Sequence, residues 1–225
     1  LFDALLFISP LAYSGAYEPF SPLLGGLRND NALKYRFSAD GLVAQVHHSL
    51  GEQPTSHSAN AAWGAYLSYV KDGWNATLAV DQQNGADTNG AHPRSRKWAV
   101  AAGYQLTKAW RLSAGYRWGE NKAANGSIAL RDDFWWLGVN HQLTGALALN
   151  VAYYQDNVKL RNGVGGQPNM RQWTVQGIYA LSKRSDVYLA LARANNAGLN
   201  LAALSTLAPG ATGQTGVTFG MRHRF

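Results

Sequence analysis

Several residues of this sequence could catalyse a reaction or bind a metal, but their spacing does not assemble a site. His47 and His48 are adjacent, so on a β-strand they would point to opposite faces and could not bind one ion together. Gly163-Val-Gly-Gly166 lies in a polar stretch with no helix after it, which argues against a phosphate-binding loop. No Gly-x-Ser-x-Gly motif presents a serine nucleophile. We therefore expect no enzyme activity, no metal and no cofactor.

Basic residues are the other chemically active group, and the net charge is +7. They do not form runs, and no helical, zinc-finger or RNA-binding motif accompanies them, so we expect no nucleic-acid partner. Many stand instead at alternate positions of segments whose other positions are apolar. Six of them follow this pattern: Lys34, Arg36, Arg111, Arg117, Arg222 and Arg224.

The alternation predicts β-strands, and the last ten residues show it clearly. Val217, Phe219 and Met221 share one face, and polar or small residues occupy the other. No stretch of about 18 apolar residues predicts a transmembrane helix.

Eleven such segments follow one another as hairpins. The short turns centre near residues 40, 72, 108, 144 and 183, and longer polar loops are predicted over 51–60, 81–96, 119–132, 155–169 and 195–214. Sandwiches and propellers do not require this strict alternation of short and long connections. It is typical of a transmembrane antiparallel β-barrel, which is the fold class we predict (all-β).

Aromatic residues support this prediction. Trp63, Trp98 and Trp173 each stand six residues before a tyrosine on the same face, namely Tyr69, Tyr104 and Tyr179. Two belts of aromatic side chains, one at each membrane interface, would explain this spacing. The apolar face would then contact lipid, and the polar face would line a water-filled lumen.

In that arrangement the six basic residues named above line the pore, and Asp81 is the single clear inward acid. A positive lumen wall attracts anions. The alternative is that inward arginines only avoid the cost of placing charge in lipid, roughly 2–4 kcal/mol each.

Three motifs resemble a known family: Arg28-Asn-Asp-Asn-Ala-Leu-Lys-Tyr35, Tyr179-Ala-Leu-Ser-Lys-Arg-Ser-Asp-Val-Tyr188, and the ending Gly-Met-Arg-His-Arg-Phe225. Together they resemble the Gram-negative general (non-specific) trimeric porins of the Neisseria, Bordetella and Burkholderia type. The resemblance covers about Arg28 to Phe225. It implies an outer-membrane pore for passive diffusion of small hydrophilic solutes and anions, a homotrimer, and contact with lipid and lipopolysaccharide.

The resemblance also implies a role for the start of the chain. In that family a long loop folds into the barrel and narrows it, and residues 1–27, rich in proline and irregular, are the candidate constriction loop. Asp3 and Glu18 are its acids, and we expect them to face the arginine wall. Residues 28–225 would supply the strands and loops of a single barrel domain, 1–225.

Eleven strands is an odd number, whereas single-chain bacterial barrels have an even number. The resemblance implies about sixteen strands, so about five strands, or ~90 residues, would precede Leu1. The alternative is a complete barrel of about ten or twelve strands that uses residues 1–12 as a strand.

Other functions remain open: a substrate-specific channel, an outer-membrane hydrolase, and a plugged structural or adhesin barrel. The inward aromatics are few and scattered for a sugar track: Tyr66, Trp136, Tyr154 and Tyr188.

Overall fold

A single antiparallel sheet forms the molecule in a computed structural model, in which neighbouring strands along the chain are also neighbours in space. The structure describes residues 4–5, 8–11, 17–20, 29–51, 56–87, 89–195 and 210–225. The strands are β1 (Ala32–Ala39), β2 (Leu42–Ser49), β3 (Ala62–Lys71), β4 (Trp74–Asn84), β5 (Arg94–Gln105), β6 (Trp110–Lys122), β7 (Ile128–Gln142), β8 (Leu147–Arg161), β9 (Met170–Ala180), β10 (Ser185–Asn195) and β11 (Gly213–His223). The prediction of eleven strands in hairpin order is confirmed.

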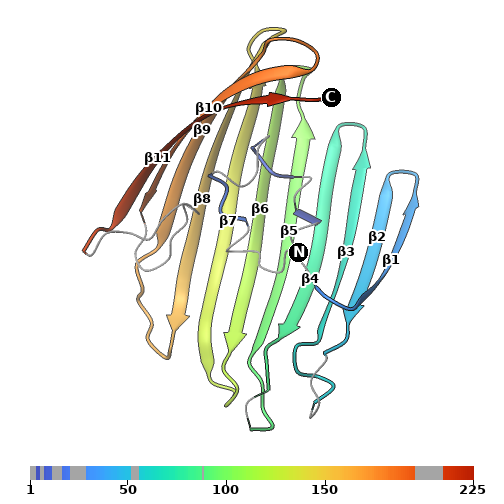
Figure 1. Ribbon diagram of the computed structural model, residues 1–225, viewed down its shortest axis with the longest axis vertical. Helices are drawn as coiled ribbons and strands as arrows, with labels where there is room; N and C mark the ends of the chain where they lie inside the picture. Colours follow the sequence, from blue (N-terminus) through green and yellow to red (C-terminus); the bar gives the residue numbers. More distant parts are fainter. Residues whose placement is uncertain are drawn as a thin grey trace.

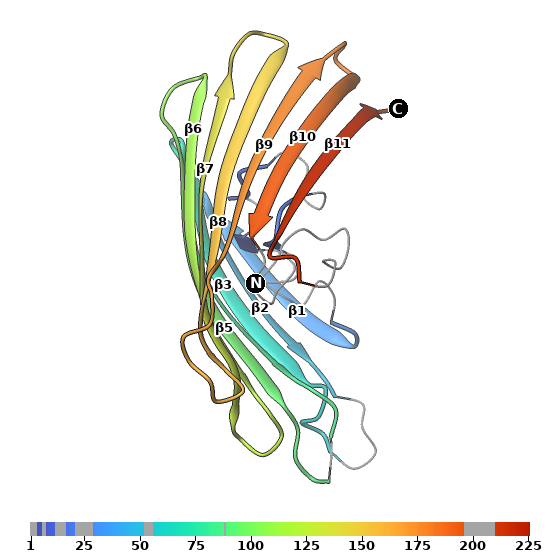
Figure 2. The same ribbon diagram turned by 90° about the vertical axis from the view of Figure 1, so that its left-hand side faces the viewer.

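The sheet is strongly curved (Figures 1 and 2). Short turns lie at one end of the strands and longer loops at the other, as the sequence predicted. Within the described residues β1 and β11 are the two edges of the sheet, and Figure 2 shows them on its hollow side.

The first two short turns show why their sequences form hairpins. Asp40-Gly41 and Asp72-Gly73 each place two consecutive residues at positive φ, between 46° and 83°. This is the backbone of a two-residue type I′ turn, which aspartate followed by glycine adopts readily. The turn fixes the register, and with it the face on which each side chain lies.

The outer, convex face is apolar through the middle of the strands. Leu33, Leu78, Leu137 and Phe219 are between 52% and 81% exposed, although a water-soluble protein would bury such side chains. Within the described residues no helix is long and apolar enough to cross a membrane.

Three central strands are longer than predicted. β6 continues to Lys122, β7 begins at Ile128 and β8 continues to Arg161, so the loops predicted over 119–132 and 155–169 are wrong in extent. The loop predicted over 81–96 is also too long, because β4 continues to Asn84 and β5 begins at Arg94. The extensions mix polar residues such as Glu120, Asp132 and Asp156 with only a few apolar ones, so their composition resembles that of a loop. Register shifts between Asn121 and Lys122 and between Arg131 and Asp132 lie in this region. Most of the loop predicted over 195–214 lies outside the described residues.

Candidate functional site

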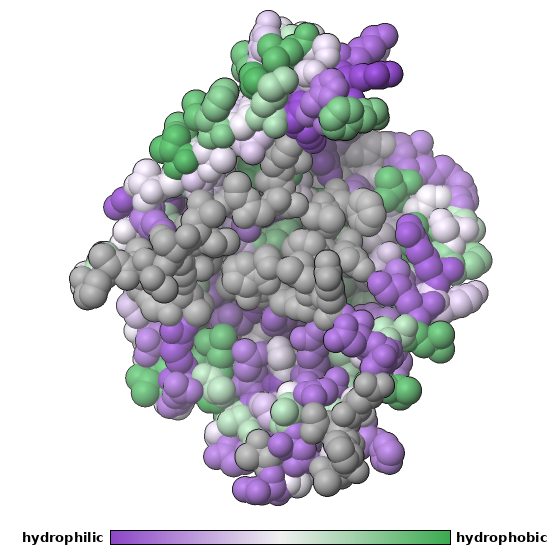
Figure 3. All heavy atoms as spheres, in the orientation of Figure 1, coloured by the Kyte–Doolittle hydropathy of each residue, from purple (hydrophilic) through white to green (hydrophobic). Residues whose placement is uncertain are grey.

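The hollow face of the sheet holds the polar side chains, and the start of the chain lies against it (Figure 2). Asn140 on β7 donates a hydrogen bond to the Pro10 carbonyl at 2.6 Å. On β9, Gln172 and Thr174 both donate to the Tyr17 carbonyl, at 2.6 and 3.0 Å. Figure 3 shows this face, with hydrophilic residues gathered over its lower, long-loop half.

Two glycines of the wall make room for this segment. A Cβ at Gly138 on β7 would stand 2.1 Å from Pro10, and one at Gly216 on β11 would stand 2.4 Å from the Tyr17 ring. Both distances are too short for real atoms. Any larger residue at these positions would therefore push the segment off the wall.

An aromatic cluster holds the middle of the segment. Phe20 packs edge-on against Trp136 and Tyr154 with ring centroids 4.9 and 6.0 Å apart, and Phe134 completes the group. All four rings are buried. Trp136 and Tyr154, which the sequence suggested were scattered, are therefore brought together to seat the segment and do not form a lumen track.

Glu18 lies inside the same contact. Its Oε1 accepts hydrogen bonds from Ser9 at 2.5 Å and from Tyr154 at 3.4 Å, and its side chain is 3% exposed. Burial raises the pKa of the Glu18 carboxyl to about 7. The expectation that Glu18 faces an arginine wall is wrong, because its contacts are Ser9, Tyr154 and the Leu11 backbone. Asp3 lies outside the described residues.

The basic residues predicted to line the pore are spread over the wall. Lys34 and Arg36 on β1 are exposed on the hollow face, opposite His47 and Gln45. Arg111 on β6 lies over Gly103, near the short turns. Arg224 follows the last residue of β11, and its backbone N–H donates to the Arg184 carbonyl.

In the described part of the chain, Arg117 and Arg222 are seen paired with carboxylates. Arg117 is 1% exposed and is paired with Asp132, while Asp156 lies 3.8 Å away. Arg222 binds Asp186 directly opposite on β10, at 2.7 Å.

The expectation that Asp81 is the single inward acid is therefore wrong. Asp132 and Asp156 fall in stretches that the sequence predicts as loops, so alternation assigns them no face. Asp186, two residues before the inward Tyr188, could have been found from the alternation itself.

Asp81 itself has two basic residues as neighbours on the hollow face. It lies opposite Lys97 on β5, and His47 approaches it at 3.5 Å over Gly64. A Cβ at Gly64 would stand 2.5 Å from the imidazole and 2.9 Å from the carboxylate, so only glycine permits this approach. The sequence analysis also did not identify Lys97. Because Lys97 is adjacent to the outward-facing Trp98, the alternation places it on the inner face.

The inner face nevertheless keeps an excess of positive charge. By strand register, the inward cations of the described strands are Lys34, Arg36, Lys97, Arg111, Arg117, Arg161 and Arg222, and the inward acids are Asp81, Asp132, Asp156 and Asp186. Seven cations against four carboxylates leave an excess of three. Within the described residues no group of three or more potential ligands could hold a metal ion.

An apolar convex face, a polar hollow face and hairpins with short and long ends together define an outer-membrane β-barrel protein. A family model described as Gram-negative porin matches residues 6–199, most of the chain. The chain therefore belongs to the Gram-negative porin family. This places it in the bacterial outer membrane.

Solved structures show the same fold. The anion-selective porin from Comamonas acidovorans superposes with a TM-score of 0.72 at 23% identity, over 88% of this chain and 60% of that one. OmpF of Salmonella typhi gives 0.66 at 19% identity, over 97% and 69%. OmpT of Vibrio cholerae, in a trimer form, gives 0.70 at 12% identity, over 95% and 71%.

This chain thus spans about 60% of the length of the Comamonas porin. A search of curated proteins finds no match.

Proposed function

We propose that this chain forms the wall of a water-filled pore through which small hydrophilic solutes diffuse passively, with a preference for anions. The proposal rests on one observation, the difference in polarity between the two faces of one sheet. The convex face exposes apolar side chains to lipid, and the hollow face carries polar and charged side chains that need water.

The preference for anions rests on the excess of three cations on the hollow face. Low-dielectric walls focus the field in an aqueous path, so a small excess of charge changes the local ion concentrations. The structurally similar Comamonas protein is described as anion-selective, which is in keeping with this sign.

The segment that includes residues 4–5, 8–11 and 17–20 acts as the constriction in this proposal. Its contacts with β7, β9 and β11 support a fixed position inside the wall. Close contacts at the two wall glycines and the buried aromatic cluster hold this constriction in place. Such a constriction limits the size of the solutes that pass.

A homotrimer is the assembly we propose. The similar Vibrio cholerae OmpT is described in a trimer form. On this chain Ala76, Ala102 and Ala114 lie in one row across β4, β5 and β6 on the convex face, where small side chains allow another subunit to approach closely.

Swelling of liposomes that contain the intact protein tests the pore. Uncharged sugars of increasing size should enter at rates that fall with size and differ little between isomers. Saturation by one sugar would instead indicate a substrate-specific channel, and no swelling would indicate a plugged barrel.

A further inference from the structure

A row of charged residues crosses neighbouring strands of the hollow face at one level. By strand register, its members on β1, β2, β3, β4 and β5 are Lys34, His47, Gly64, Asp81 and Lys97. Imidazole is the side chain whose charge ordinarily changes between about pH 5 and 8. The total charge of this row therefore depends on the protonation of its histidine.

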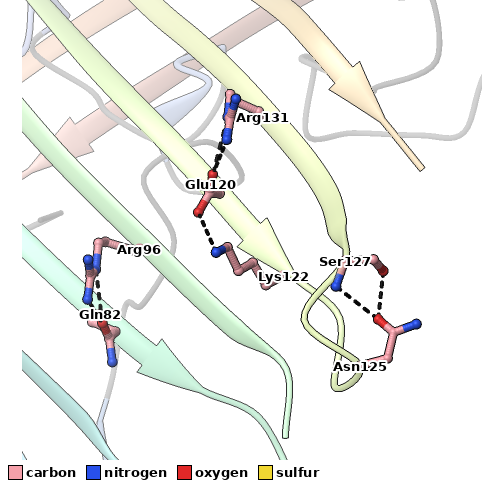
Figure 4. Close-up of polar contacts among 7 residues, drawn as sticks. All are labelled: Gln82, Arg96, Glu120, Lys122, Asn125, Ser127 and Arg131. Carbon is pink, nitrogen blue, oxygen red and sulfur yellow. Dashed lines mark hydrogen bonds and ion pairs between the residues drawn. The ribbon is translucent and has the colours of Figure 1, made fainter. Parts of the chain in front are cut away.

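The contact between His47 and Asp81 spans an intervening strand. An ordinary cross-strand pair joins adjacent strands, as Arg96 and Gln82 do on β5 and β4 (Figure 4). The imidazole Nε2 instead lies 3.5 Å from the carboxylate Oδ2, although β3 runs between β2 and β4. Gly64 occupies the intervening position, and its missing side chain leaves the space in which the two groups meet.

Both partners keep contact with the lumen. The side chains of His47 and Asp81 are 13% and 12% exposed, so water reaches the pair and can exchange its proton. The hydrogen bonds that hold the N-terminal segment go to β7, β8, β9 and β11. The row on β1 to β5 lies on the part of the wall away from these hydrogen bonds.

The electrostatic surroundings of the imidazole are mostly basic. Within the described elements, the nearest charged and titratable groups by strand register are Lys34 and Arg36 on β1, Tyr66 on β3, Asp81 on β4 and Lys97 on β5. With a neutral imidazole, two lysines and one aspartate give the row a charge of +1. Protonation makes it +2 and raises the excess on the hollow face from three cations to four.

We infer that His47 is a specificity-determining residue of the pore, and that its protonation strengthens the preference for anions. The inference rests on the anion-preferring pore proposed above. A protonated imidazole balances the charge of Asp81, so the carboxylate no longer offsets the lysines of the row. In a narrow aqueous path, one added charge changes the local concentrations of anions and cations in opposite directions.

The test measures the reversal potential of the intact channel across a dilute KCl gradient, near ~0.1 M, at pH 5 and at pH 8. His47→Gln replaces the imidazole with a polar group that does not titrate. His48→Gln is the matched control, because His48 is the next residue on β2 and is exposed on the convex face. The Glu18 carboxyl, whose pKa is about 7, titrates over the same range in every variant, so the difference between variants reports the histidine.

One charge about 10 Å from the path, screened by ~0.1 M salt, changes the ratio of chloride to potassium permeability by about 1.5- to 2-fold. Between pH 8 and pH 5 this ratio should rise more in the wild type and in His48→Gln than in His47→Gln, by that factor. Asp81→Asn should raise the ratio at pH 8 and move the pH step to lower pH, because the imidazolium loses its stabilising carboxylate. This second variant provides the answer if His47→Gln does not fold.

The same pH dependence in the wild type and His47→Gln would overturn the inference, as would an unshifted pH step in Asp81→Asn. With either result, a preference for chloride at both pH values would leave the proposed pore standing. No preference for chloride at either pH value would refute the proposed anion preference itself, and this inference with it.

Discussion

Arg117 on β6 and Asp132 on β7 form an ion pair that passes over Gly119. A Cβ at this glycine would stand 2.2 Å from a guanidinium nitrogen and 2.6 Å from a carboxylate oxygen. The bare backbone of one strand thus lets two charges meet across a hairpin, on a wall where Arg117 is almost completely buried. Gly64 allows His47 to approach Asp81 in the same way.

Removing the acid of the buried pair should therefore be costly. Asp132→Asn leaves the Arg117 charge buried with only the more distant Asp156, and we expect a loss of about 3 kcal/mol in the free energy of unfolding. Asp40→Asn removes an exposed ion pair with Lys71 and should cost less than about 1 kcal/mol. Urea unfolding in detergent measures both losses of free energy. Equal losses would contradict the assignment of Arg117 and Asp132 as a buried ion pair.

Single-channel conductance can test whether the N-terminal segment depends on its close approach to glycines of the wall. Gly138→Val fills the position occupied by Pro10, so the segment should leave the wall and the single-channel conductance should change. Gly177→Val is the control, because a Cβ at that glycine meets open space on the convex face. If both variants conduct like the wild type, the segment does not constrict the pore.

Glu18 makes the docking of this segment dependent on pH. Its pKa is about 7 in the folded protein and near 4.5 when exposed, so the folded state retains the proton more tightly. Stability from this group is complete below about pH 4.5 and falls as the pH rises through 7, by up to about 3 kcal/mol. The wild type should unfold at a higher temperature at pH 5 than at pH 8, relative to Glu18→Gln measured at the same two values. A pH difference that is identical in the two proteins would contradict the role of Glu18.

The strands and short turns could be predicted because each depends on local chemistry. Alternation along β11 and the Asp40-Gly41 turn are set by residues close together in the chain. The lipid-facing tryptophans follow from the same period of two. No distant contact is needed to place these elements.

The charge balance of the hollow face could not be predicted in the same way. Asp132 and Asp156 lie where β7 and β8 continue past the apolar band, and a register shift next to Asp132 disturbs the alternation. Phe20 packs against residues more than 100 positions away in the chain. Whether an inward arginine is neutralised depends on its partner on a neighbouring strand. The spacing of residues within one strand does not reveal that partner.

The orientation of the sheet in the membrane can be tested by placing a charge at two depths. Leu137 lies in the middle of the apolar face of β7 and Leu143 lies at its short-turn end, and both are exposed. Leu137→Arg should cost about 2–4 kcal/mol and Leu143→Arg about 0–1 kcal/mol, because the cost of charge falls toward the interface. Unfolding in lipid vesicles measures both. Similar small costs would mean that this face does not contact the lipid interior.

The reversal potential of the intact channel across a KCl gradient tests the central claim most directly. In dilute salt, near ~0.1 M, charges act over about 10 Å, and the potential should show a preference for chloride. Lys34→Gln/Arg36→Gln should reduce that preference, whereas the charge-balanced Asp186→Asn/Arg222→Gln should leave it unchanged, because it removes one charge of each sign. At ~1 M salt, where screening shortens the range to about 3 Å, the preference should fade. A preference for potassium in dilute salt would contradict the account.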